Sequence, residues 1–249
     1  MLHDLAGDRA LWRPLILRLA ERRRVIAADL RGHGESPAPP LDEGYDAGTL
    51  AADCLRLLDG LGIDRFAVAG SDLGGAVALE LAFTAPQRVA AVVLSDCAPA
   101  PRWPADDALV AGFKRTLTRR LAAAEEGGMA GVARSILDYE AEPRNAEDPG
   151  PSQRLIARWT AVPLAGFIGG ARALLDRPDR TSELAALSVP QLWIAGALAP
   201  LRGATRQASA LSSLGRLELL PRCGAGYAWQ RPEPRASAVV AFLDAVAAA

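Results

Sequence analysis

The stretch Gly70-Ser71-Asp72-Leu73-Gly74-Gly75 decides the expected fold, because it lies between a strand-like segment and a helix-forming segment. The preceding run, Phe66–Ala69, is short and apolar like a buried strand, and the following run, Ala76–Ala82, favours a helix. Glycines at positions 70 and 74 permit a turn that is too tight for side chains, which puts Asp72 at its apex. Ser71 comes one residue before the apex and is therefore the weaker nucleophile candidate.

Strand-like and helical segments alternate on both sides of this turn, which predicts an α/β fold with a mostly parallel sheet and helices on both faces. The alternation stops between residues 97 and 187, where the chain is helical or irregular and rich in proline, so we expect a helical cap inserted there. Residues 1–96 and 188–249 then form the core. The expected strands are 25–28, 66–69, 89–94, 191–195 and 216–220, and the expected helices are 9–21, 49–61, 76–82, 205–212 and 234–246.

Composition excludes several classes of function. The 249 residues carry a net charge of −1 with dispersed basic residues, so we expect no nucleic-acid binding. No apolar run reaches about 18 residues and the segment Met1–Asp4 does not resemble a signal peptide, so we expect a cytoplasmic protein without a membrane span. Three cysteines are too few for a disulfide framework or a zinc site. Lys114 is the only lysine, a bias that we attribute to coding composition.

Four segments resemble motifs of the α/β-hydrolase superfamily, in the capped group of lactonases, esterases, epoxide hydrolases and haloalkane dehalogenases. Residues 70–75 resemble its nucleophile elbow, and His3-Asp4-Leu5 resembles its His-Gly-X oxyanion segment. Asp29–Ser36 resembles the loop after the fourth strand, and Arg231-Pro232-Glu233 resembles the segment that follows the catalytic histidine. The resemblance implies an α/β-hydrolase fold in which the amides of Leu5 and Leu73 form the oxyanion hole.

The chain departs from this family at the positions that carry hydrolysis. Ala225 stands in place of the catalytic histidine, and Ala199 stands in place of the acid that orients it. The only histidines are His3, on the oxyanion side where it can approach a substrate, and His33, in a loop that is usually structural. A Ser-His-Asp relay needs a base and an orienting acid, so we exclude ordinary esterase or lipase activity.

Aspartates occupy three positions around the expected site. In family members with an apex aspartate, that residue forms an alkyl-enzyme ester, and the histidine is needed to hydrolyse this ester. An enzyme with Asp72 but with Ala225 in place of the histidine should therefore stop after one turnover. If Asp4 also faces the pocket, repulsion and desolvation should raise one of the two pKa values and create an acid and a base. The alternative is that Asp4 faces solvent. Asp96 matches the position after the sixth strand where some dehalogenases keep their acid, and we include it among the substrate-binding candidates; the alternative is a plain polar residue at the end of a strand.

Two further features concern the surroundings of the expected site: the start of the chain and the aromatic residues of the cap. Only Met1 and Leu2 precede His3, whereas the resemblance implies two strands and most of a third, so either the start lies upstream or another segment or subunit fills the gap. Among the aromatic residues of the cap, Trp159 is the strongest candidate for a substrate contact, with Tyr227 approaching from the other side. The other aromatic candidates are Trp103, Phe113, Tyr139, Phe167 and Trp229.

Our leading hypothesis is a non-hydrolytic enzyme that uses Asp72 and Asp4 in acid/base catalysis. The reaction would be a cyclisation, an addition, a lyase reaction or an isomerisation. The substrate would be a largely apolar small molecule, for example a polycyclic secondary metabolite, and the enzyme would need neither a cofactor nor a metal ion. The first alternative is an Asp72-dependent epoxide hydrolase or a related hydrolase. The second is a non-catalytic ligand-binding protein. A homodimer is compatible with the sequence, and the only other partner that we expect is the small-molecule substrate.

Overall fold

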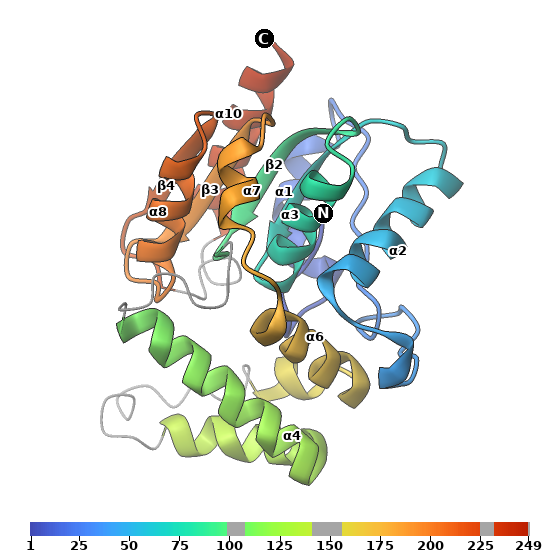
Figure 1. Ribbon diagram of the computed structural model, residues 1–249, viewed down its shortest axis with the longest axis vertical. Coiled ribbons are helices and arrows are strands. Elements are labelled where there is room, and N and C mark those ends of the chain that lie inside the picture. The colour runs from blue at the N-terminus through green and yellow to red at the C-terminus, as the bar shows by residue number, and fades with distance from the viewer. Residues whose placement is uncertain (99–107, 141–155, 225–231, 249) are drawn as a thin grey trace.

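The computed structural model describes residues 1–98, 108–140, 156–224 and 232–248 (Figure 1). Its centre is a sheet in which neighbouring strands run parallel in the order β1-β2-β3-β4. All six residues of β3 are buried, as expected of a central strand covered on both faces. The predicted α/β architecture is therefore confirmed. The strands are β1 (Phe66–Ser71), β2 (Val89–Ser95), β3 (Gln191–Gly196) and β4 (Gly215–Leu220).

Helices cover both faces of the sheet and bury two separate apolar clusters. On one face, η1 (Arg9–Trp12) and α1 (Arg13–Leu19) pack beside the long carboxyl-terminal helix α10 (Pro232–Ala247). The other face carries four helices that bury the larger of the two clusters. These helices are α2 (Ala47–Gly60), α3 (Leu73–Thr84), α7 (Thr181–Ala186) and α8 (Arg202–Leu211).

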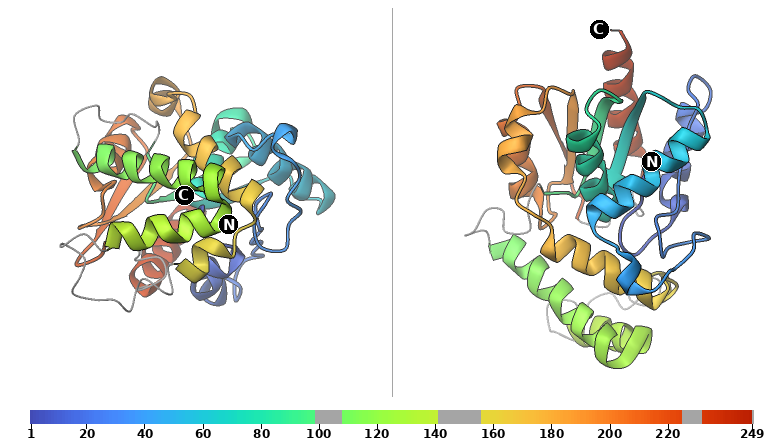
Figure 2. Two further views of the ribbon diagram at one scale, coloured as in Figure 1. Left: turned by 90° about the horizontal axis from the view of Figure 1, so that it is seen from below. Right: turned by 45° about the vertical axis from the view of Figure 1, so that its right-hand side comes forward.

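Two further helices form a layer beyond the carboxyl ends of the strands (Figures 1 and 2). Helix α4 (Ala108–Glu140) is bent at Gly128, whose φ of 61° lies in the left-handed region, so its two arms lie side by side. Helix α6 (Leu164–Asp176) packs against α4 and connects this layer to the core. Both helices belong to the segment expected as the cap, while α7 returns to the side of the sheet, next to α8.

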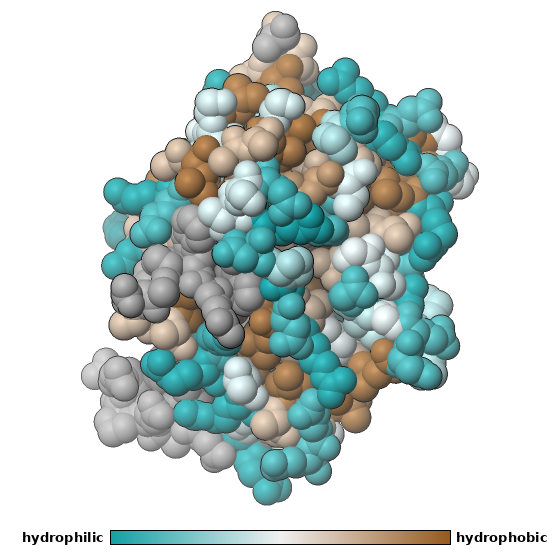
Figure 3. Space-filling view, in the orientation of Figure 1, coloured by the Kyte–Doolittle hydropathy of each residue, from teal (hydrophilic) through white to brown (hydrophobic). Residues whose placement is uncertain are grey.

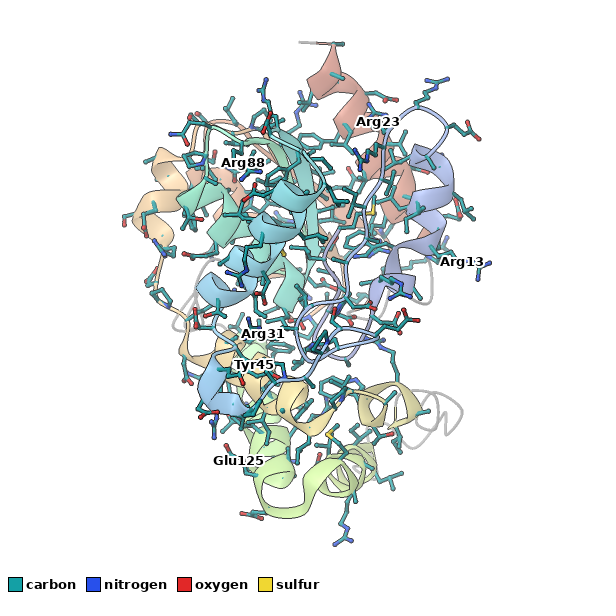
Figure 4. The ribbon with its side chains drawn as sticks, turned by 90° about the vertical axis from the view of Figure 1, so that its right-hand side faces the viewer. Arg13, Arg23, Arg31, Tyr45, Arg88 and Glu125 are labelled. Carbon is teal, nitrogen blue, oxygen red and sulfur yellow. The ribbon has the colours of Figure 1, made fainter. Side chains whose placement is uncertain are left out.

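Close backbone contacts dock α6 onto the loop before α2. A Cβ atom on Gly166 would lie 1.9 Å from the carbonyl oxygen of Gly32, so neither chain tolerates a side chain at this crossing. The Tyr45 ring fills the space beside Gly169, and its hydroxyl donates to a backbone carbonyl at 2.7 Å. Arg31 braces the same loop through an ion pair at 2.8 Å with Asp53 of α2. Figure 4 shows Arg31 and Tyr45 together at this junction.

The amino-terminal residues occupy the place of a central strand but cover only its end. Leu2 forms parallel bridges to Ala28 on one side and Gly70 on the other, and the amine of Met1 donates to the carbonyl of Ile26 at 2.7 Å. The predicted strand 25–28 is wrong, because so short a neighbour leaves only a single bridge at Ala28. Next to Met1, a largely apolar groove of about 460 Å³ lies between residues 25–28 and β1.

Polar and apolar side chains are interspersed on the face shown in Figure 3. Within the described ranges, no helix has the length and apolar character needed to cross a membrane.

Candidate active site

Asp72 sits at the apex of the turn between β1 and α3, with φ 50° and ψ −107°. This backbone conformation is uncommon outside glycine, although aspartate tolerates it better than most residues. A Cβ atom on Gly70 would lie 2.1 Å from the carbonyl oxygen of Gly74, and one on Gly74 would lie 2.2 Å from that of Leu2. Both glycines are therefore required by close backbone contacts, as the sequence predicts.

Backbone amides hold the carboxyl group of Asp72. Its Oδ2 accepts a hydrogen bond from the amide of Leu5 at 3.2 Å, and the amide of Leu73 also hydrogen-bonds this group. Burial, together with the nearby charge of Asp4, raises the pKa of Asp72 from 3.8 to about 6. The structure thus brings Leu5 and Leu73 together at Asp72, and a carboxyl group with this pKa exchanges its proton near neutral pH.

Asp96 lies at the end of β2 and shares a cavity of about 30 Å³ with Asp72. Its backbone also has a positive φ, 46°, and its carboxyl group accepts a hydrogen bond from the amide of Gly196. Burial and then the charge of Asp72 raise the pKa of Asp96 well above its ordinary value. Within the described residues, its Oδ1 has no hydrogen-bond partner. Asp96 therefore favours the protonated form, which can donate a hydrogen bond or a proton.

Asp4 is held at the contact between the core and the cap. Its Oδ2 pairs with Nη2 of Arg158 at 2.6 Å, and Nε of the same arginine donates to the carbonyl of Ala6 at 2.9 Å. The Asp4 side chain is only 14% exposed, so it does not point into bulk solvent. Its negative charge contributes to the raised pKa of Asp72, which shows that the two carboxylates are electrostatically coupled. The sequence did not reveal Arg158 as the partner.

Both histidines of the chain are engaged by the backbone. The Nε2 atom of His3 accepts from the amide of Leu30 at 2.9 Å, so Nδ1 carries the proton and donates to the carbonyl of Asp4 at 2.7 Å. The ring of His33 contacts the carbonyl of Leu5 at 2.9 Å. Burial lowers the pKa of both rings, that of His33 to about 4. Both ring nitrogens of His3 are therefore engaged by the backbone, and a substrate contact by His3 stays a prediction.

Comparison with known proteins identifies the family. The family model described as the alpha/beta hydrolase fold matches residues 1–210. The chain belongs to this family.

Individual relatives of this α/β-hydrolase-fold protein carry different activities in their names. It is 28% identical over 200 residues to 3-oxoadipate enol-lactonase 1 of Acinetobacter baylyi, covering 80% of this chain and 70% of that protein. A match to the soluble epoxide hydrolase of Corynebacterium sp. is 41% identical over 99 residues, only 40% of this chain and 34% of that one. The crystal structure of a hydrolase from Pseudomonas aeruginosa PA01 superposes with a TM-score of 0.79 at 28% identity, covering 97% and 88% of the two chains.

The family's catalytic positions are only partly visible in this α/β-hydrolase-fold protein. Ala199, which the resemblance places at the position of the orienting acid, is buried in the turn after β3. Ala225, at the histidine position, and Tyr227, an expected substrate contact, lie outside the described residues. Within the described residues, no three His, Cys, Asp or Glu side chains gather in a way that could hold a metal ion.

Two aromatic residues expected in the cap, Trp159 and Phe167, pack against each other. The ring centroid of Trp159 lies 5.7 Å from that of Phe167, and the guanidinium carbon of Arg120 lies 4.4 Å from the Trp159 centroid. A substrate contact by Trp159 stays a prediction.

Sequence reasoning missed two cationic residues beside the carboxylates. Arg177, which follows α6, and Lys114, on α4, line the same cavity as Asp72 and Asp96. No local pattern marks Arg177, because its position depends on how α6 docks. Lys114 carried one usable signal, since it is the only lysine in the chain.

Proposed function

We propose that this protein is a cofactor-free enzyme that uses Asp72 for proton transfer in a non-hydrolytic reaction. The reaction class is a cyclisation, addition, lyase or isomerisation step on a largely apolar small molecule. One observation carries the proposal: a carboxyl group with a pKa of about 6, held by two amides, faces a second, protonation-prone carboxyl group in one cavity. A base whose pKa lies near the working pH transfers protons most efficiently.

The two carboxyl groups have complementary roles in this proposal. The hydrogen bond from Leu5 fixes Oδ2 of Asp72, and the ionised carboxylate takes a proton from the substrate carbon. Asp96 in its protonated form donates to the oxygen on which negative charge develops. Pairs of titratable groups whose surroundings separate their pKa values provide such an acid and base. In this proposal Asp96 replaces Asp4 as the partner of Asp72 in the acid/base pair that the sequence suggested, while Asp4 raises the pKa of Asp72.

The state of the histidines supports a non-hydrolytic reaction. Acyl-enzyme or alkyl-enzyme hydrolysis needs a base that activates water next to the nucleophile. Both ring nitrogens of His3 are hydrogen-bonded to the backbone, and His33 is buried against Leu5. Ala199 leaves the position of the orienting acid without a carboxylate.

An Asp72-dependent hydrolase, such as an epoxide hydrolase, is the second candidate. The amides of Leu5 and Leu73 fix the Asp72 carboxylate, and this arrangement also suits attack on a substrate carbon. The partial match to a soluble epoxide hydrolase supports this reading. In that reaction an Asp72 oxygen bonds to the carbon, the epoxide C–O bond breaks, and water later cleaves the ester.

Hydrogen exchange separates the two candidates. In D₂O, the protein should introduce deuterium next to the carbonyl of 2-tetralone, and Asp72→Asn should abolish this exchange. The exposed residue Asp42 supplies the matched control, Asp42→Asn, which should leave exchange unchanged.

Mass spectrometry and ester assays supply the opposing outcomes. The intact protein should stay unmodified after incubation with styrene oxide, and 4-nitrophenyl acetate should be cleaved no faster than by Asp72→Ala. A covalent adduct on Asp72 would transfer our support to the epoxide-hydrolase reading. Saturable, Asp72-dependent ester cleavage would refute the non-hydrolytic proposal. We further propose that the protein binds neither nucleic acid nor membranes. Analytical ultracentrifugation would test whether it forms a homodimer.

A further inference from the structure

The cavity beside Asp72 is bordered by positive charge on its cap side. Arg177, directly after α6, and Lys114, on α4, face the cavity from the cap, whereas Asp72 and Asp96 face it from the ends of β1 and β2. The two pairs therefore come from opposite layers of the molecule. A ligand between the core and the cap would meet carboxyl groups on one side and cations on the other.

Arg177 has an unsatisfied hydrogen-bond donor among the described residues. Its guanidinium hydrogen-bonds the thiol of Cys97, and its charge acts on Asp72, which places its head group at the cavity. Its Nε atom is buried and has no hydrogen-bond partner among the described residues. A buried donor without an acceptor is unfavourable, so an acceptor supplied by a ligand would relieve the penalty.

Lys114 is exceptional within this chain. The sequence contains 28 lysine and arginine residues, and Lys114 is the only lysine among them. Across the described ranges, no ion pair within 4.0 Å includes Lys114. The Lys114 side chain is half-buried and brings a compact charge to the cavity, with no ion-pair partner among the described residues. Coding bias explains why lysine is rare but does not explain this position.

The charges in the cavity do not balance. Among the described lining residues the charged groups are Asp72, Asp96, Arg177 and Lys114, and burial raises the pKa of Asp96, which favours its neutral form. Apart from the Cys97 thiol, the other described lining residues are apolar. This environment suits a small anionic group attached to an apolar skeleton. The apolar lining residues are Val110, Phe113, Leu117, Leu174, Leu175 and Leu201.

We propose that the substrate carries a carboxylate that binds between Arg177 and Lys114, while its reacting carbon faces Asp72. A planar guanidinium and one ammonium match the two oxygens of a carboxylate, whereas a phosphate dianion needs more donors than this wall provides. The cavity of about 30 Å³ holds a group of that size, and the rest of the substrate lies along the apolar wall between α4 and α6. This inference rests on the proposed function only for the role of Asp72.

Binding of benzoate and of its neutral isostere benzamide tests the inference. Calorimetry should show that benzoate binds at least 10-fold more tightly than benzamide at pH 7.5. Arg177→Gln and Lys114→Gln should each weaken benzoate at least 5-fold and leave benzamide unchanged. Arg172→Gln, which removes an exposed arginine on α6, is the matched control and should change neither affinity.

The single lysine provides a second measurement that needs no substitution and therefore does not depend on whether a variant folds. Reductive ¹³C-methylation labels Lys114 as the only lysine, and benzoate should shift its methyl signal whereas benzamide should not. Equal affinity for the two probes, or an unmoved Lys114 signal at saturating benzoate, would overturn the carboxylate site. Asp72→Asn distinguishes the two proposals, because it should tighten benzoate binding by removing a like charge. If Asp72→Asn kept full deuterium exchange while benzoate still bound, the proposed function alone would fail.

Discussion

Replacing Asp72 with asparagine should stabilise the folded protein at neutral pH while it removes proton transfer. Asparagine preserves the shape of the side chain, and it tolerates the positive φ of 50° at the apex at least as well as aspartate. Its carbonyl oxygen can accept the amide of Leu5 in place of Oδ2. The substitution therefore removes the charge and changes little else, so stability reports the cost of ionised Asp72.

The magnitude follows from the pKa of Asp72, which rises from 3.8 to about 6 on folding because of burial and the charge of Asp4. An acid with a raised pKa favours folding at low pH and loses that contribution as pH rises through the folded-state value. Since one pKa unit corresponds to about 1.4 kcal/mol, ionised Asp72 costs the fold about 3 kcal/mol at pH 8. The same linkage gives roughly half of that at pH 5 and about 0.6 kcal/mol at pH 4.

Urea denaturation at pH 4, 5 and 8 measures this dependence. The free energy of unfolding of Asp72→Asn should exceed that of the unmodified protein by an amount that grows with pH. Asp42→Asn, at an exposed position in η2 (Leu41–Glu43), should show no such pH dependence. The gain in unfolding free energy could instead be the same at all three pH values, or Asp72→Asn could be less stable than the unmodified protein at pH 8. Either result would refute the idea that burial of the ionised Asp72 carboxylate destabilises the fold.

Three further predictions concern the surroundings of the site. Arg158→Met removes the counter-charge of Asp4, so the pH midpoint of Asp72-dependent deuterium exchange should rise by about 0.5, whereas Arg158→Lys should preserve it. Gly74→Ala places a Cβ atom 2.2 Å from the carbonyl of Leu2, so it should cost at least about 2 kcal/mol in urea denaturation. Gly60→Ala has open space and is the control; equal stability of the two variants would contradict the packing argument. An extension of about five β-branched residues fused to Met1 should occupy the apolar groove and raise the melting temperature, and an equal gain from a Gly-Ser extension would contradict this.

The elements that depend on local sequence were predicted well. The elbow at Asp72 follows from glycines that the backbone requires at positions 70 and 74, and the strands after it follow from short apolar runs between helical segments. The predicted strand 25–28 failed because a strand needs a neighbour along its length, and only Met1 and Leu2 lie beside it. Local preference therefore identifies a segment that can form a strand, while pairing decides whether it does.

The sequence by itself placed Asp72 at the turn between a strand and a helix, and its resemblance to the family predicts that Ala199 and Ala225 stand in place of the hydrolytic relay. Only the tertiary structure decided what the carboxylates around this turn do. It pairs Asp4 with Arg158, 154 residues away in the cap, and it buries Asp96 in one cavity with Asp72. It also brings Lys114 of α4 and Arg177, directly after α6, to that cavity. Ionisation depends on burial and on charges that are near in space, and neither quantity can be read from positions along the chain.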